Sequence, residues 1–356
     1  MVSKKPHSAF GPFGVWLWEN AWTPGTAAVA ERLGYRTLWI GGSPAASLKS
    51  VSAILNETER VTVATGIVNI WQADSLETAE SFLRIQEEHP GRFVLGIGSG
   101  HREATPERVR PLAALREYLD VLDGEGVPAE SRLLAALGDK TLALAAQRSL
   151  GAHPYLTTPE HTAHARGILD AAASDDGNGH DDASPEAALC ALQEARSERA
   201  HADVTRGSRG PSHVQGHEEA SQGSCDQGDV RGLAQPLQPA PAPRALPLLA
   251  PELKVSLDRD PGAARERARE FLARYFRLEN YVGTLKRFGA TDADFEGGGS
   301  DDLIDRVCAN PTAELAALGL RAHLKAGADH VAVQPIGKDT LGDLERIADA
   351  LGLTKE

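Results

Sequence analysis

Apolar and polar residues alternate along the chain in two patterns, one typical of buried strands and one typical of helices. Both patterns are clearest between Val61 and His101. Residues 61–71 are apolar and β-branched without a helical period, which predicts a buried strand. Residues 75–92 carry one apolar stripe at helical spacing, and residues 93–101 form a second buried strand that ends in Gly-Ser-Gly-His. Two buried strands joined by a helix predict a parallel βαβ unit. Parallel folds bind ligands at the carboxyl ends of their strands, so the unit also predicts a functional edge.

The same alternation of strand and helix extends over most of the chain. Prolines lie where helices are expected to begin, at Pro24, Pro106, Pro159 and Pro261. This alternation favours an α/β fold of the (β/α)8 TIM-barrel type over a doubly wound sheet. We expect eight strands, which begin close to Phe13, Thr37, Val61, Phe93, Arg132, His153, Leu248 and His330.

The alternation stops at Ala171 and returns at Leu248. Residues 171–247 contain no Ile, Phe, Tyr, Trp, Met or Lys, so they cannot bury enough apolar surface to offset their chain entropy. We predict a disordered or weakly ordered low-complexity insertion between the sixth helix and the seventh strand, although the composition also suits a stretch translated out of frame. The chain then divides into a first barrel part (1–170), the insertion (171–247) and a last barrel part (248–356).

Bulk composition excludes several classes of protein. The 356 residues carry a formal net charge of −13, which argues against a nucleic-acid or anionic-membrane partner. No apolar run is long enough to span a membrane, and the N-terminus lacks the apolar core of a secretory signal. The 3 cysteines are too scattered for a disulfide framework or a zinc site. We therefore expect a cytoplasmic protein without a bound metal.

Four stretches together resemble the luciferase-like monooxygenase superfamily, and within it the deazaflavin oxidoreductases that use coenzyme F420. They are residues 64–71 with the helix that follows, 93–101, 134–158 and 323–336. The resemblance covers residues 13–169 and 248–353 and leaves out the insertion. It implies a TIM barrel that binds a flavin-type cofactor and a small-molecule substrate at its C-terminal face. Family members are often dimers, so a homodimer is expected by analogy.

The end of the third strand is the first candidate site. Members of the superfamily carry a non-proline cis peptide there, in a bulge that backs the tricyclic ring, and Gly66–Ile67 is the best match. The resemblance therefore assigns cofactor contacts to Thr65, Gly66, Ile67 and Asn69. The alternative is an ordinary strand end in which glycine relieves crowding.

The end of the fourth strand is the second candidate site. Gly98, Ser99 and Gly100 would let the backbone approach a flat ring or a phosphate closely. His101 follows them, and histidine is suited to moving protons near neutral pH. Related deazaflavin enzymes can carry an acid or base at this position. The alternative is a surface or capping histidine.

Two helix starts could contact the cofactor tail. Gly138, Asp139 and Lys140 lie between a strand and a helix, where backbone N–H groups and a lysine can bind an anion. Thr158 precedes another helix and could do the same. The alternative for both is helix capping, with Asp139 as the capping residue and Lys140 in solvent.

The substrate pocket is expected beside the first two strands. Trp16 and Trp18 end the first strand and would line the pocket, where Glu19 is a second candidate for moving a proton. Ser43 follows the second strand, where some deazaflavin dehydrogenases have an Asp-His pair. That difference puts a sugar-phosphate dehydrogenase activity in doubt.

These residues lead to one hypothesis and two rivals. The protein would transfer a hydride between F420 and an unidentified small organic substrate, with His101 or Glu19 handling the proton. The first rival is an FMN-dependent monooxygenase supplied by a separate reductase. The second is a non-catalytic or inactivated barrel, which would bind neither cofactor.

Deleting residues 171–244 tests the insertion hypothesis. We expect the free energy of unfolding to rise or stay the same, because the segment has too few apolar residues to add to a core. Urea denaturation of the full chain and of the shortened chain measures the change. Loss of folding on deletion would mean that the segment is structural.

Overall fold

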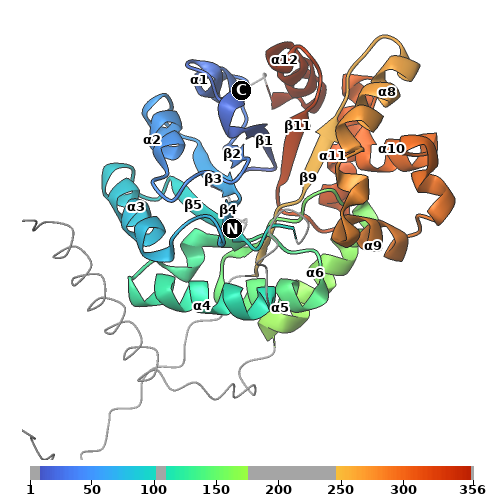
Figure 1. Cartoon of the computed structure of the whole chain (residues 1–356). Helices are drawn as coiled ribbons and strands as arrows, with labels where there is room; N and C mark the ends of the chain where they lie inside the picture. The colour runs from blue at the N-terminus through green and yellow to red at the C-terminus, as the bar shows by residue number, and fades with distance from the viewer. Residues whose placement is uncertain (1–8, 102–109, 175–245, 354–356) are drawn as a thin grey trace, which may run out of the picture. The chain divides into compact units, whose positions relative to one another are not determined.

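The computed structural model describes residues 9–101, 110–174 and 246–353. Parallel strands form a ring with helices around its outside (Figure 1). The strands are β1 (Phe13–Trp18), β2 (Thr37–Gly41), β3 (Thr62–Gly66), β4 (Val68–Asn69), β5 (Phe93–Gly98), β6 (Arg132–Leu134), β7 (Gly151–Ala152), β8 (Leu248–Leu249), β9 (Glu252–Val255), β10 (Cys308–Ala309) and β11 (Val331–Pro335).

One broken strand closes the ring. β8 pairs with β7 and β9 pairs with β11, and only Ala250 and Pro251 lie between β8 and β9. These two residues keep the pairing, because the Ala250 N–H donates to Ala152 O and the Ala332 N–H donates to Pro251 O, both at 2.9 Å. With β3 and β4 also counted as one strand, eight strands complete the barrel, as predicted. β10 pairs only with β9 and lies outside this ring.

Two strand predictions need correction. Residues 153–158 were expected to form the sixth strand, but the strand is β7, which ends at Ala152. Pro154 has no N–H to donate, which ends the regular ladder, although the His153 N–H donates to Leu134 O and the Glu252 N–H donates to Pro154 O. The short strand β10 was not predicted, because the pattern around Cys308 looks helical up to Val307.

Side chains inside the ring form a separate apolar cluster from those that face the helices. Trp16, Trp39 and Ala64 lie next to one another across β1, β2 and β3, and they belong to the inner cluster. Val15, Leu38 and their outward neighbours pack against the helices. The period of two along each strand separates these two cores.

Capping residues and prolines mark several helix starts, but α1 begins at Thr26, two residues after the predicted start at Pro24. Pro159 and Pro261 open α6 and α8, and Asp74 caps α3 by accepting from Leu76 N and Glu77 N. α4 begins at Pro111, and the predicted helix start at Pro106 lies outside the described residues. The helices are α1 (Thr26–Arg32), α2 (Lys49–Asn56), α3 (Ser75–Glu88), α4 (Pro111–Gly124), α5 (Asp139–Arg148), α6 (Pro159–Ser174), α8 (Pro261–Leu272), α9 (Glu279–Arg287), α10 (Asp301–Val307), α11 (Ala313–Lys325) and α12 (Thr340–Leu351), with 3-10 turns η1 (Glu19–Ala21), η3 (Ala129–Ser131), η4 (Tyr275–Arg277) and η5 (Asp292–Gly298).

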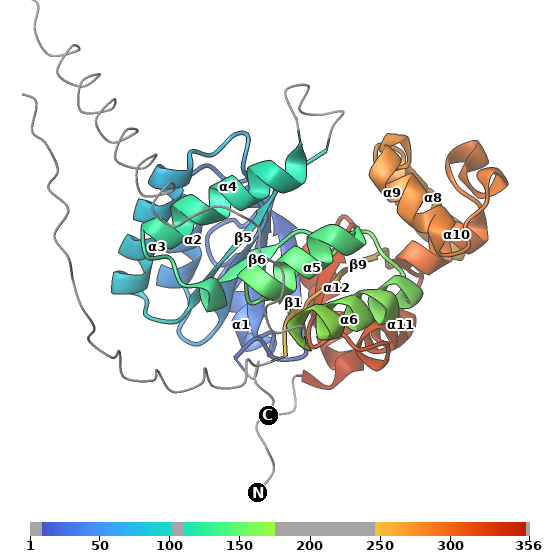
Figure 2. The ribbon, with the colours of Figure 1, turned by 90° about the horizontal axis from the view of Figure 1, so that it is seen from below.

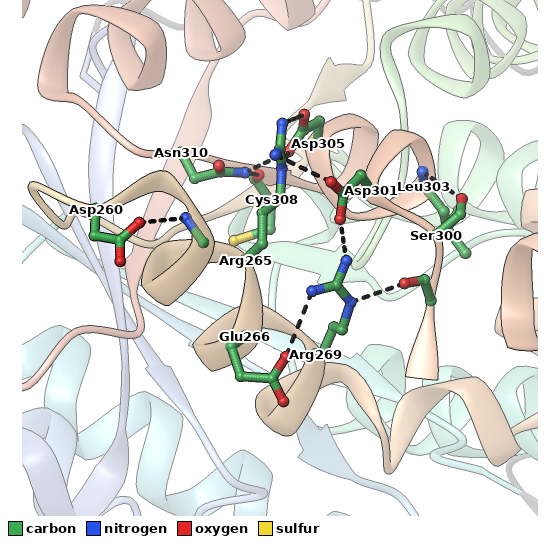
Figure 3. A network of polar contacts seen from close by, with 12 residues as sticks. Asp260, Arg265, Glu266, Arg269, Ser300, Asp301, Leu303, Asp305, Cys308 and Asn310 are labelled. Atoms are coloured by element: carbon green, nitrogen blue, oxygen red, sulfur yellow. Dashed lines mark hydrogen bonds and ion pairs between the residues drawn. The ribbon is translucent and has the colours of Figure 1, made fainter. Parts of the chain in front are cut away.

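Helices α8, α9 and α10 form a group at one side of the barrel (Figure 2). Arg265 of α8 pairs with Asp301 at 3.1 Å and with Asp305 at 2.6 Å, and Arg269 pairs with Asp301 and donates to Gly299 O (Figure 3). A third apolar cluster includes Leu272, Tyr275 and Tyr281. These contacts hold η4 and α9 in place beside the barrel.

The predicted insertion lies between α6 and the seventh barrel strand, as expected. α6 continues to Ser174, so the helix takes in the first four residues assigned to the insertion, 171–174. Residues 175–245 lie outside the described part of the chain. No helix in the described part is both long enough and apolar enough to cross a membrane.

Three buried histidines predict how stability depends on pH. Burial lowers the pKa of His153, His323 and His330 from 6.5 to about 4. Below pH 6.5 the unfolded chain therefore binds protons that the folded chain does not, and the free energy of unfolding falls as the pH drops. We expect a loss of roughly 1–2 kcal/mol per histidine between pH 7.5 and 5 in urea titrations. His323→Gln should reduce this dependence, and a stability that rises toward pH 5 would contradict the account.

Candidate active site

A bulge interrupts the pairing at the end of β3. Ala64 pairs with Val94 and Val68 pairs with Ile97, so three residues of one strand face two of the other. The Thr65 hydroxyl fills the gap, because it donates to Gly96 O and accepts from Gly96 N, both at 2.8 Å. The Gly66–Ile67 peptide in this bulge is cis, so the predicted geometry is confirmed.

Gly66 lies at the mouth of the barrel against two inward-facing side chains. A Cβ at this position would lie 2.6 Å from Trp16 Nε1 and 3.1 Å from His153 Nε2, so only glycine fits without movement. The Ile67 side chain turns toward β5, where its Cδ1 atom would lie 3.1 Å from a Cβ on Gly98. The bulge therefore presents a half-buried backbone surface without a side chain of its own.

The end of β5 lies beside the bulge, since Asn69 pairs with Gly98. Gly100 has a φ of +57°, and a Cβ there would lie 2.8 Å from Asn69 Nδ2. Asn69 Oδ1 accepts from Trp71 N, and Trp71 Nε1 donates to Ser99 O at 2.9 Å. The two predicted cofactor segments are thus held together by their own hydrogen bonds.

His101 is half-buried and faces α9. Its Nε2 atom lies 3.4 Å from the Tyr281 hydroxyl, and its Nδ1 atom lies 3.3 Å from Asn280 Nδ2. The rings of His101 and Tyr281 are 5.0 Å apart. The histidine is therefore oriented by groups that lie far away in the sequence.

The predicted substrate residues differ in exposure. Trp16 is buried and meets Trp18 edge to face, with ring centroids 5.1 Å apart. Glu19 is exposed in η1 immediately after β1. Ser43 is half-buried with a φ of +58°. Trp18, Glu19 and Ser43 thus follow β1 and β2 at the same edge as the bulge.

Asp139 does not cap α5, which corrects the capping interpretation. Gly138 is the N-cap residue, and the Asp139 carboxylate accepts two hydrogen bonds from Arg287 and one from His164. The bonds from Arg287 and His164 lower the pKa of Asp139 to about 2. Asp139 therefore ties α5 to α6 and α9, while Lys140 is exposed.

A groove of about 320 Å³ lies between the start of α5 and α9. Gly138 and Gly283 border it with open space beside them, and Asn280, Thr284 and Arg287 contribute polar groups. Thr158 lines a different cleft, of about 250 Å³, with Glu160, Asp305, Arg306 and His323. The structure therefore separates Thr158 from the Gly138 segment.

Several polar residues at the mouth were not predicted. Lys254 and Glu252 form an ion pair 2.7 Å long, and both side chains are fully buried. Burial raises the pKa of Glu252 and lowers the pKa of Lys254, while the charge of each partner opposes the shift. The Lys254 Nζ atom lies 3.7 Å from the centroid of the Tyr155 ring. The Glu-x-Lys spacing on a predicted strand was the available signal, since it puts both charges on one face.

A chain of hydrogen bonds crosses the mouth above this ion pair. The Tyr155 hydroxyl donates to Gln334 Oε1 and lies 2.9 Å from the Tyr275 hydroxyl. Tyr275 accepts in turn from Arg274 Nη2 at 3.1 Å. Tyr275 ends a predicted helix and Tyr281 lies in a less regular stretch, and neither pattern gives a sign of a site. Among the described residues there is no cluster of histidine, cysteine and carboxylate side chains that could hold a metal ion.

Comparison with known proteins supports the predicted resemblance. A family model described as luciferase-like monooxygenase matches residues 23–124. No curated protein sequence matches the chain significantly.

Solved structures share the fold at low sequence identity. An F420-dependent secondary alcohol dehydrogenase, in complex with an F420–acetone adduct, has a TM-score of 0.63 at 12% identity, over 97% of this chain and 99% of that one. The coenzyme F420-dependent tetrahydromethanopterin reductase of Methanopyrus kandleri has a TM-score of 0.61 at 16% identity, over 96% and 99%. The oxygenating constituent of 3,6-diketocamphane monooxygenase from Pseudomonas putida, in complex with FMN, has a TM-score of 0.57 at 13% identity, over 96% and 96%. The predicted resemblance to the luciferase-like monooxygenase superfamily is therefore confirmed, by sequence over residues 23–124 and by fold over the barrel.

Proposed function

We propose that the protein is an oxidoreductase that transfers a hydride between coenzyme F420 and a small organic substrate. The observation that carries the proposal is the bulge at the end of β3, which joins Gly66 and Ile67 to the Gly98–His101 segment at the barrel mouth. Two structural neighbours that use F420 agree with it. An FMN-dependent monooxygenase is the second candidate, because another neighbour of the same fold was solved with FMN.

The residues at the bulge fit a flat ring. Gly66 has no side chain and packs against Trp16 and His153, and the Ile67 side chain is turned toward β5, so a flat ring would meet the half-buried backbone of the peptide between them. Thr65 fixes this surface to β5 through Gly96. A bound deazaflavin would supply the carbon that gives or takes the hydride. The task of these residues is to position the ring and to exclude water.

The groove between α5 and α9 fits the tail of the cofactor. FMN and F420 both carry a phosphate, and the N-terminus of α5 offers backbone N–H groups that no side chain caps. Arg287 and Thr284 line the same groove. Asp139 is held by Arg287 and His164, so we assign the tail contacts to the backbone of Gly138 and to Lys140.

His101 is the best candidate to hold the proton that accompanies the hydride. It is half-buried beside Gly100, and contacts with Asn280 and Tyr281 orient its ring. A histidine at this edge can exchange a proton near neutral pH. Glu19 is exposed, so it would act only if the bound substrate covers it.

Cofactor titration tests the proposal directly. Trp16, Trp18 and Trp71 lie around the bulge, so a bound ring should quench tryptophan emission. We expect saturable quenching with F420 at lower concentration than with FMN. Tighter binding of FMN would favour the monooxygenase, and no saturable change with either cofactor would favour the non-catalytic barrel.

Thr65 variants test whether the ring of the cofactor binds against the bulge. Thr65→Val leaves both Gly96 hydrogen-bonding groups without the hydroxyl, which should cost roughly 1–3 kcal/mol of unfolding free energy. The affinity for F420 should fall with it, because the bulge is no longer fixed to β5. Thr65→Ser keeps the hydroxyl and is the control. Equal F420 affinity in the two variants would argue against this role.

A further inference from the structure

Arg274 is held over three aromatic rings at the barrel mouth. Its guanidinium carbon lies 4.8 Å from the centroid of the Trp18 ring, 5.0 Å from Phe271 and 4.8 Å from Tyr275. Aromatic faces attract a guanidinium and restrict its orientation. The side chain is nevertheless exposed, so the rings fix it without enclosing it.

Most of the hydrogen-bond donors of Arg274 are unused. One Nη2 group donates to the Tyr275 hydroxyl at 3.1 Å, and Arg274 forms no ion pair with a carboxylate of the described residues. The arginines of α8 behave differently, since Arg265, Arg267 and Arg269 all pair with aspartates. Arg274 therefore has no carboxylate partner among the described residues, in a chain whose net charge is −13.

Aromatic contacts connect Arg274 to the bulge. Trp18, below the guanidinium, meets Trp16 at 5.1 Å between ring centroids. Trp16 Nε1 in turn lies 2.6 Å from the Cβ position of Gly66. Lys254 also lies at the mouth, but Glu252 neutralises it and it is fully buried. Among the described residues at the mouth, Arg274 thus supplies a positive charge that no carboxylate neutralises.

We propose that Arg274 binds an oxyanion of the substrate, a carboxylate or a phosphate group, and so selects an anionic substrate. A guanidinium presents two parallel N–H groups that match such an oxyanion. The three rings orient the guanidinium before the ligand arrives, which reduces the entropy lost on binding. The assignment to the substrate rests on the proposed function, whereas oxyanion binding itself does not.

The phosphate of the cofactor is the other possible source of the oxyanion. The groove at the start of α5 offers a separate place for that phosphate, beside Gly138 and Thr284. Arg274 instead lies over Trp18, at the carboxyl end of β1. We therefore assign Arg274 to the substrate and test the two sources separately.

Titration with benzoate and with inorganic phosphate tests the site in the cofactor-free full chain. We expect at least one of these probes to change tryptophan emission saturably, since Trp18 lies beneath the guanidinium. Arg274→Gln should weaken this binding about tenfold or more, and Arg274→Lys should weaken it less because the charge remains. Arg277 lies three positions after Arg274, and no aromatic contact of its side chain is found among the described residues. Arg277→Gln removes the same charge and should bind both probes as tightly as the wild type does.

Two results would overturn the oxyanion site. One is the absence of saturable binding of either probe to the wild type, and the other is equal weakening by Arg277→Gln and Arg274→Gln. F420 titration of Arg274→Gln separates the two sources of the oxyanion. An unchanged F420 affinity supports a site for the substrate. A loss of F420 affinity as large as the loss of benzoate affinity would assign the site to the cofactor phosphate and contradict the proposal. If the wild type binds no F420, the proposed function fails while the oxyanion measurement still stands.

Discussion

Closure of the parallel ring is the constraint on which the structure depends. The segment from Leu248 to Val255 pairs with β7 on one side and with β11 on the other, so no barrel strand is left with an open edge. A closed ring forces the inward side chains of distant strands to meet. Trp39 of β2 stacks on His153 at 4.1 Å and donates to His330 Nε2 at 3.0 Å, and these contacts join β2 to the residue after β7 and the residue before β11.

Closure of the ring also places polar groups at the barrel mouth, where their burial costs free energy. A buried ion pair such as Lys254–Glu252 is often less favourable than apolar residues of the same volume, because both charges lose their hydration. The Tyr155 ring against the ammonium group partly offsets this cost. Tyr275 and Tyr281 complete the cover, and the arginine network between α8 and α10 fixes the helices around them. The mouth is therefore built from the barrel and from a helical group that the chain adds after the seventh strand.

Periodicity predicted the barrel well because most strands are short and apolar, and many of them have glycine or proline at or next to an end. It failed at His153, where β7 is only two residues long and the inward histidine resembles a continuing strand. The site could be predicted only in part. The resemblance located the Gly66–Ile67 bulge and the Gly98–His101 turn, but Arg274 and Tyr275 come from the end of a predicted helix, and Tyr281 from a less regular stretch, neither of which carries a site motif. Their role depends on tertiary packing, which no local spacing encodes.

The central claim is that the flat ring of a redox cofactor packs against the backbone at Gly66–Ile67. A crystal structure of the full chain soaked with F420 tests this claim most directly. The account predicts ring density stacked on that peptide, with the side chains of Trp18 and His101 at its border. A ring bound elsewhere, with the mouth of the barrel left empty, would contradict it.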